Sequence, residues 1–150
     1  MNITVQLRAA KIPYISLIAV HYWFVIKTQT KTERWEIWQN SNASSHSWGY
    51  LHQNLLPPQS GVGCGDSWLE KQWTGTNAET LSQIIQNSPE TYCYRHLYRY
   101  WPGPNSNSYI QWVLRQAKIN YLPGPLGIGK DYLGLIGFKR YNKIIFNFFY

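Results

Sequence analysis

The hydrophobic pattern of this 150-residue chain changes its period at Asn77. Before Asn77, apolar and aromatic residues run in blocks or alternate with polar ones, which is typical of β-strands. After it, the run AETLSQIIQN brings Leu81, Ile84 and Ile85 to helical spacing. Strands followed by helices predict an α+β fold, and we expect a mostly antiparallel sheet packed against two main helices.

Four segments of the first half have strand composition. The longest, residues 15–28, is rich in β-branched and aromatic residues and should be partly buried on both faces. RWEIWQ, residues 34–39, alternates in strand fashion and should form a hairpin with it. Segments 47–56 and 68–74 predict two further strands, the first of them ended by Pro57 and Pro58.

Two helices are expected in the second half. Asn77 is a suitable N-cap for the first, which should end before Pro89. The second should begin directly after the rigid turn WPGPNSN, residues 101–107, and segment 92–100 between them fits either an extended run or a short helix. LPGPLGIGKDYLG predicts a long loop, and the closing IIFNFFY is strand-like.

Length and composition predict one folded domain covering residues 1–150. Aromatic residues make up 17% of the chain, whereas disordered segments are poor in them. The net charge is +7, and residues 91–150 hold eight Lys and Arg against Asp131 alone. This asymmetry suits an anionic partner, but the cations are scattered singly, so a solvated basic face is favoured and nucleic-acid binding is disfavoured.

Several classes of site lack their signatures. Cys64 and Cys93 form no zinc-ligand spacing, so we expect no metal. Two free, buried thiols are favoured, and the alternative is one disulfide between them. No phosphate-binding glycine run occurs, and no cofactor is expected. The apolar stretch 12–26 is shorter than the roughly 20 residues that span a bilayer and lacks a clear cleavage site, so we expect an unprocessed chain that is not transmembrane, with a cytoplasmic location favoured.

Ser106 is the candidate nucleophile because it is expected at a helix N-terminus, where unpaired backbone N–H groups stabilise an oxyanion. The alternative is that Ser106 only caps its helix. His21, unusual in an apolar strand, is the candidate base, and the alternative is a core histidine with a satisfied hydrogen bond. His96 is the second candidate base, while His46 and His52 are expected to be exposed.

Residues around the turn complete the candidate site. The backbone amides of Asn107 and Ser108 are candidate oxyanion donors, and Asn105 and Trp101 should line the same cleft. Lys130 and Asp131 follow a glycine-rich loop and form either an electrostatic clamp in the cleft or an ordinary surface ion pair. Other tryptophans either stack on a ligand or belong to the core: Trp48, Trp68, Trp73 and Trp112.

The run WPGPNSNSYIQWVLR resembles the WPGPNSNTF-type signature of an uncharacterised bacterial family, a domain of unknown function. His21 with YWFV, the run 34–37 and GIGKDYLG occur in the order that this family shows. The resemblance extends over about residues 18–136. Residues 137–150 depart from it, so we expect a truncated or divergent C-terminus.

A more distant resemblance is to circularly permuted papain-like proteins, the NlpC-related and lecithin retinol acyltransferase-like groups. These carry a histidine on an early strand and later an Asn-Cys-Asn-like turn, which Asn105-Ser106-Asn107 matches with serine in place of cysteine. The resemblance implies a papain-like hydrolase or acyltransferase, although no third catalytic residue is evident from the sequence. The alternative is a catalytically inactive module whose aromatic, basic cleft binds a small molecule, peptide, glycan or lipid headgroup.

Overall fold

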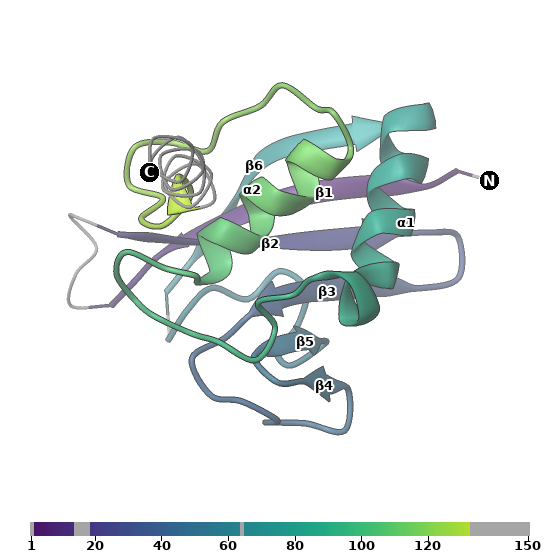
Figure 1. Ribbon diagram of the computed structural model, residues 1–150. Coiled ribbons are helices and arrows are strands. Elements are labelled where there is room, and N and C mark those ends of the chain that lie inside the picture. Colours follow the sequence, from purple (N-terminus) through teal and green to yellow (C-terminus); the bar gives the residue numbers. More distant parts are fainter. Residues whose placement is uncertain (1, 14–18, 64, 133–150) are drawn as a thin grey trace, which may run out of the picture.

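The computed structural model describes residues 2–13, 19–63 and 65–132. Within them, a six-stranded sheet has the order β4-β5-β3-β2-β1-β6 with antiparallel neighbours, and two helices cover one of its faces (Figure 1). The predicted α+β fold is therefore confirmed. The elements are β1 (Thr4–Lys11), β2 (Val20–Lys27), β3 (Thr32–Ile37), β4 (Ser47–Trp48), β5 (Leu51–Gln53), β6 (Ser67–Thr74), α1 (Gly75–Thr91) and α2 (Ser106–Gln116).

Strand β1 was not predicted, although it lies inside the sheet between β2 and β6. Its sequence, TVQLRAAK, contains Gln, Arg, Ala and Lys, which have weak strand preference. Val5, Leu7 and Ala9 alternate on one face and are fully buried. Pairing with two long strands therefore decides the structure of this segment, rather than its own composition.

The two faces of the sheet carry separate cores. On the helix side, Phe24 and Trp35 belong to a large cluster that includes Leu81 of α1 and Val113 of α2. On the opposite side is a smaller cluster of Ala10, Trp23, Val25 and Val62. Because side chains alternate along a strand, His21 projects to the same face of β2 as Trp23.

Helix α1 differs from its predicted bounds at both ends. It begins at Gly75 after Thr74, not after an Asn77 cap, and it continues through Pro89 to Thr91. Proline has no N–H, so the carbonyl of Ile85 loses its usual helical donor. The hydroxyl of Ser88 donates to that carbonyl at 2.6 Å, which satisfies it and lets the helix continue.

The second predicted helix is confirmed, with Asn105 as its N-cap and Ser106 as its first residue. Segment 92–100 forms neither a strand nor a helix, and the turn after it contains two cis peptide bonds, Trp101–Pro102 and Gly103–Pro104. Predicted strand 47–56 is two short strands instead, joined through Gly49, whose φ of 69° suits glycine. The strand expected at residues 144–150 lies outside the described residues.

We predict that Ser88→Ala lowers the free energy of unfolding by about 1–3 kcal/mol. The substitution leaves the buried Ile85 carbonyl without a donor and removes the 2.9 Å contact between Ser88 Oγ and Tyr109 Oη. Thr91→Ala is the matched control, because Thr91 Oγ1 makes a similar bond to Asn87 in solvent. Urea denaturation measures the free energy of unfolding of both variants. An equal decrease in Ser88→Ala and Thr91→Ala would contradict the conclusion that the Ser88 hydroxyl compensates for Pro89.

Candidate functional site

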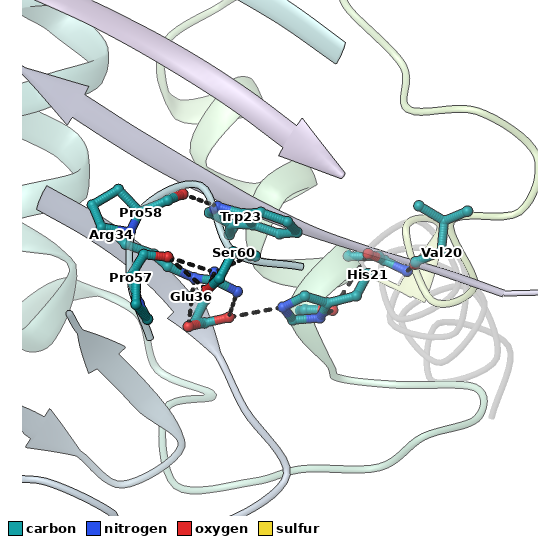
Figure 2. A network of polar contacts seen from close by, with 10 residues as sticks. Val20, His21, Trp23, Arg34, Glu36, Pro57, Pro58 and Ser60 are labelled. Carbon is teal, nitrogen blue, oxygen red and sulfur yellow. Dashed lines mark hydrogen bonds and ion pairs between the residues drawn. The ribbon is translucent and has the colours of Figure 1, made fainter. Parts of the chain in front are cut away.

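His21 connects two polar groups that come from distant parts of the sequence. Its Nδ1 lies 3.0 Å from Ser106 Oγ, and its Nε2 lies 2.9 Å from Glu36 Oε2. The side chain of His21 is 6% exposed and that of Glu36 is fully buried. The three side chains form a hydroxyl–imidazole–carboxylate relay shielded from bulk water, and Figure 2 shows the imidazole next to the carboxylate.

Helix α2 positions Ser106 through its N-cap. Asn105 Oδ1 accepts hydrogen bonds from the backbone N–H groups of Asn107 and Ser108, and Ser108 Oγ accepts one from the Asn105 N–H. This reciprocal arrangement is a capping box, which fixes the first turn of the helix. Ser106 itself does not cap the helix, and its hydroxyl lies closer to His21 Nδ1, at 3.0 Å, than to its other acceptor, Asn107 Oδ1, at 3.4 Å.

Glu36 is held on its other side by Arg34. Arg34 Nη2 donates to Glu36 Oε2 at 2.7 Å, and Nε lies 2.7 Å from Oε1 as an ion pair without hydrogen-bond alignment. Burial alone raises the pKa of Glu36, but the hydrogen bond and charge of His21 and the charge of Arg34 outweigh it and leave this pKa below its ordinary value. Glu36 is therefore ionised at neutral pH.

The ionised carboxylate determines where the imidazole proton lies. A carboxylate only accepts hydrogen bonds, so we assign the proton of neutral His21 to Nε2, which donates to Glu36. Nδ1 then carries the lone pair and accepts from the Ser106 hydroxyl. Such an imidazole can take up the hydroxyl proton, and the resulting imidazolium is stabilised by Glu36.

Arg34 also holds the loop that covers the smaller core. Its Nη1 donates to the carbonyls of Pro57 and Ser60 at 3.1 and 2.6 Å, and its guanidinium lies 4.0 Å from the centre of a Trp23 ring (Figure 2). Trp23 Nε1 donates to the Pro58 carbonyl at 2.9 Å. The loop 57–60, the two central strands and the carboxylate are thus fixed together.

Asn107 and Ser108 hold the neighbouring loop rather than a ligand. Asn107 Nδ2 donates to the carbonyls of Val20 and Ile128 at 3.0 and 2.9 Å, and Ser108 Oγ donates to the Gly129 carbonyl at 2.6 Å. Their backbone amides, expected to bind an oxyanion, already donate to Asn105. Among the described residues, no acceptor binds the backbone N–H of Ser106, the first residue of α2.

Two cavities meet at His21. The larger, here the His21 cleft, has a volume of about 350 Å³ and apolar or aromatic walls that include Ile37, Trp38 and Val62. The smaller, here the Ser106 cavity, has a volume of about 30 Å³ and reaches Ser106. Tyr98 and Tyr100 border both cavities, whereas Ser106 lines only the smaller one.

Other predicted site residues lie apart from the relay. Trp101 is 73% exposed and lines neither cavity. Lys130 and Asp131 pair with one another at 2.7 Å, which matches the ordinary ion pair. His96 is exposed and lines neither cavity.

Two expectations about burial were wrong. His52 is fully buried instead of exposed, because its ring nitrogens bind Ser47 Oγ at 2.7 Å and the Asn40 carbonyl at 3.0 Å. Cys93 is exposed instead of buried, while Cys64 lies outside the described residues.

Sequence reasoning missed Glu36 as the third member of the relay. One signal was available: in RWEIWQ, Arg34 and Glu36 are two residues apart and so share one face of a strand. A guanidinium and a carboxylate on one face of a buried strand indicate an ion pair. That pair points to His21 only once the pairing of β2 with β3 is known.

No cluster of three or more His, Cys, Asp or Glu side chains suited to a metal ion occurs in the described part of the chain. Over the same residues, neither helix has the length and apolar character needed to cross a bilayer.

A family model described as a protein of unknown function, DUF3750, matches residues 2–132. Neither the curated proteins nor the solved structures gave a match.

We predict that Glu36→Gln lowers the free energy of unfolding by about 3 kcal/mol at pH 7, because it leaves buried Arg34 without its counter-charge. With a folded pKa below the ordinary 4.5, the contribution of Glu36 is complete above pH 4.5 and is lost as the pH falls through the folded pKa. The variant should therefore lose less stability than the wild type on acidification.

Urea titrations between pH 7 and pH 3 test this. Burial lowers the pKa of His52, and because the charge of Glu36 opposes this lowering, His52 titrates differently in the two proteins. The comparison is therefore made between pH 4.5 and pH 3, where the Glu36 carboxylate itself titrates. Glu79→Gln removes an exposed carboxylate of α1 and is the control. Parallel stability curves for wild type and Glu36→Gln would refute the assignment of an ionised Glu36.

Proposed function

We propose that this chain, which belongs to the DUF3750 family of proteins of unknown function, is a serine hydrolase or acyltransferase acting on an ester or amide. One observation carries the proposal: Ser106, His21 and Glu36 form a continuous relay with contacts of 3.0 and 2.9 Å. In this assignment Ser106 is the nucleophile, His21 the general base and Glu36 the residue that orients and stabilises the imidazole.

The relay supports a two-step acyl transfer. In the first step, Ser106 Oγ forms a bond to the substrate carbonyl carbon while its proton moves to His21 Nδ1. The bond from that carbon to the leaving oxygen or nitrogen then breaks, and His21 gives its proton to the leaving atom. In the second step, water or another acceptor forms a bond to the acyl carbon of the Ser106 ester and gives its proton to His21. The bond between that carbon and Oγ then breaks, the acyl product leaves, and His21 returns the proton to Oγ.

The start of α2 supplies stabilisation for the negative charge that develops on the carbonyl oxygen. The backbone N–H of Ser106 is the candidate donor, since the amides of Asn107 and Ser108 bind Asn105. The N-terminal end of a helix also carries partial positive charge, which favours an oxyanion at this position. The proposed oxyanion donor is therefore the backbone N–H of Ser106 and not those of residues 107 and 108.

Glu36 supplies the stronger activation that a serine nucleophile needs compared with a cysteine. A hydroxyl is far less acidic than a thiol, so histidine alone activates it poorly. An ionised carboxylate bonded to Nε2 stabilises the imidazolium that forms when Ser106 is deprotonated. Arg34 keeps that carboxylate ionised and holds it in place.

Access to Ser106 requires side-chain movement. The Ser106 cavity, at about 30 Å³, has room for a water molecule but not for an ester group. Tyr98 and Tyr100 border this cavity and lie in a segment without helix or strand, which suits displacement by a substrate. The proposed reaction therefore includes an opening step at these two tyrosines.

The same restricted access favours a second candidate, a binding module without catalysis. In that case the His21 cleft is the ligand site and the relay serves only to hold the strands and α2 together. Aromatic side chains line the cleft, as expected, but no Lys or Arg is among its described lining residues, so the binding of an anionic headgroup is not supported. Small molecules and uncharged peptide side chains fit this lining better.

We predict that a fluorophosphonate, which phosphonylates activated serines with loss of fluoride, labels Ser106 and that Ser106→Ala abolishes the labelling. Ser47 is the matched internal control, since its hydroxyl lies 2.7 Å from His52 Nδ1 but His52 Nε2 binds the Asn40 carbonyl, not a carboxylate. Intact-mass measurement and peptide mapping check the modified residue. An unlabelled Ser106 in a folded protein would favour the binding module.

We predict that Glu36→Gln lowers kcat for p-nitrophenyl acetate by about 10²–10⁴-fold while changing KM little. The carboxamide retains the shape of Glu36 but favours the wrong imidazole tautomer and provides no counter-charge. Glu79→Gln, on the exposed side of α1, should keep the wild-type rate. Retained turnover in Glu36→Gln would remove Glu36 from the proposed mechanism.

A further inference from the structure

We propose that the His21 cleft binds the leaving group of the substrate and that this group is an uncharged, apolar alcohol or amine. This inference rests on the proposed acyl transfer and adds the substrate class. It comes from the position of the cleft relative to the two reacting side chains and from the character of its walls.

The His21 cleft adjoins the small cavity that reaches the Ser106 hydroxyl. Ile12, His21, Tyr98 and Tyr100 border both the cleft and the Ser106 cavity. A carbonyl held at Ser106 therefore has one of its two substituents next to a space of about 350 Å³. That volume lies in the usual range for sites that take one small organic group.

The imidazole identifies which substituent enters the cleft. His21 takes the proton of Ser106 at Nδ1 and must deliver it to the leaving atom, so that atom lies within hydrogen-bond reach of the ring. The remainder of the leaving group then extends along the side of the ring that is away from Ser106. Among the described residues, His21 but not Ser106 lines the cleft, which places the cleft on the leaving-group side.

The lining selects for an apolar leaving group. Trp38 lies edge-on to His21 with ring centres 5.3 Å apart, and Ile37 and Val62 add aliphatic surface. No Asp, Glu, Lys or Arg occurs among the described lining residues. An ammonium or carboxylate in this space would lose hydration without gaining a counter-charge, whereas alkyl or aryl carbon would gain from leaving water.

Two matched ester series test the assignment. In the first, the acyl group is always acetyl and the alcohol is ethanol, butanol or hexanol, whose leaving oxygens have similar basicity. In the second, the alcohol is always ethanol and the acid lengthens from acetate to hexanoate. Rates are followed by pH-stat titration of the acid released.

We expect kcat/KM to rise in the alcohol series about threefold to fourfold per buried methylene, on the order of 100-fold from ethyl to hexyl, and to change much less in the acid series. Gln39→Trp narrows the cleft at an exposed position and should therefore reduce the rise of kcat/KM with the length of the alcohol. Gln83→Trp, on the exposed side of α1, is the control and should keep the wild-type dependence.

The outcomes separate the two proposals. In one set of outcomes, hydrolysis depends on Ser106 while kcat/KM varies with chain length in the acid series, or in neither series. Either result overturns the leaving-group cleft and leaves the proposed reaction standing. Absence of turnover and of Ser106 labelling overturns the reaction. Shifts of the Trp38 indole N–H signal when 1-hexanol is added to Ser106→Ala would then identify the cleft as a binding site alone, which also overturns its role for a leaving group.

Discussion

The buried ion pair between Arg34 and Glu36 is the interaction on which the contacts of the relay and of loop 57–60 depend. Both side chains are fully buried, so each loses its hydration and must be satisfied by protein groups. Arg34 binds the carbonyls of loop 57–60, and Glu36 binds His21. Such pairs contribute little net stability, but removal of one partner leaves a costly unpaired charge, so the pair fixes the arrangement of these segments.

Sequence reasoning found two of the three relay residues because each has an unusual local setting. His21 interrupts an apolar strand, and Ser106 follows a turn whose composition predicts a helix start. Glu36 has no such setting, since a glutamate in an alternating strand is usually exposed. Its role depends on the register between β2 and β3, which is a non-local property of the sheet.

The fold shows the same division between local and non-local causes. Strands rich in aromatic and β-branched residues, and the helix capped by Asn105, could be predicted from composition and capping. Strand β1 could not, because its partners on both sides stabilise a segment of weak strand preference. Helix α1 continues past Pro89 because the hydroxyl of Ser88 replaces the missing N–H donor. The rule that proline ends a helix does not take such a side-chain donor into account.

The order of the three residues along the chain has a consequence for biosynthesis. Ser106 follows His21 by 85 residues, so at 5–20 residues per second the ribosome adds it roughly 4–17 seconds after the histidine. The carboxylate and imidazole are translated with the early strands, while α2 emerges late and brings the hydroxyl with it. The contact between the hydroxyl and the imidazole therefore forms only after α2 has been translated and has packed onto the sheet, later than the contact between the imidazole and the carboxylate can form.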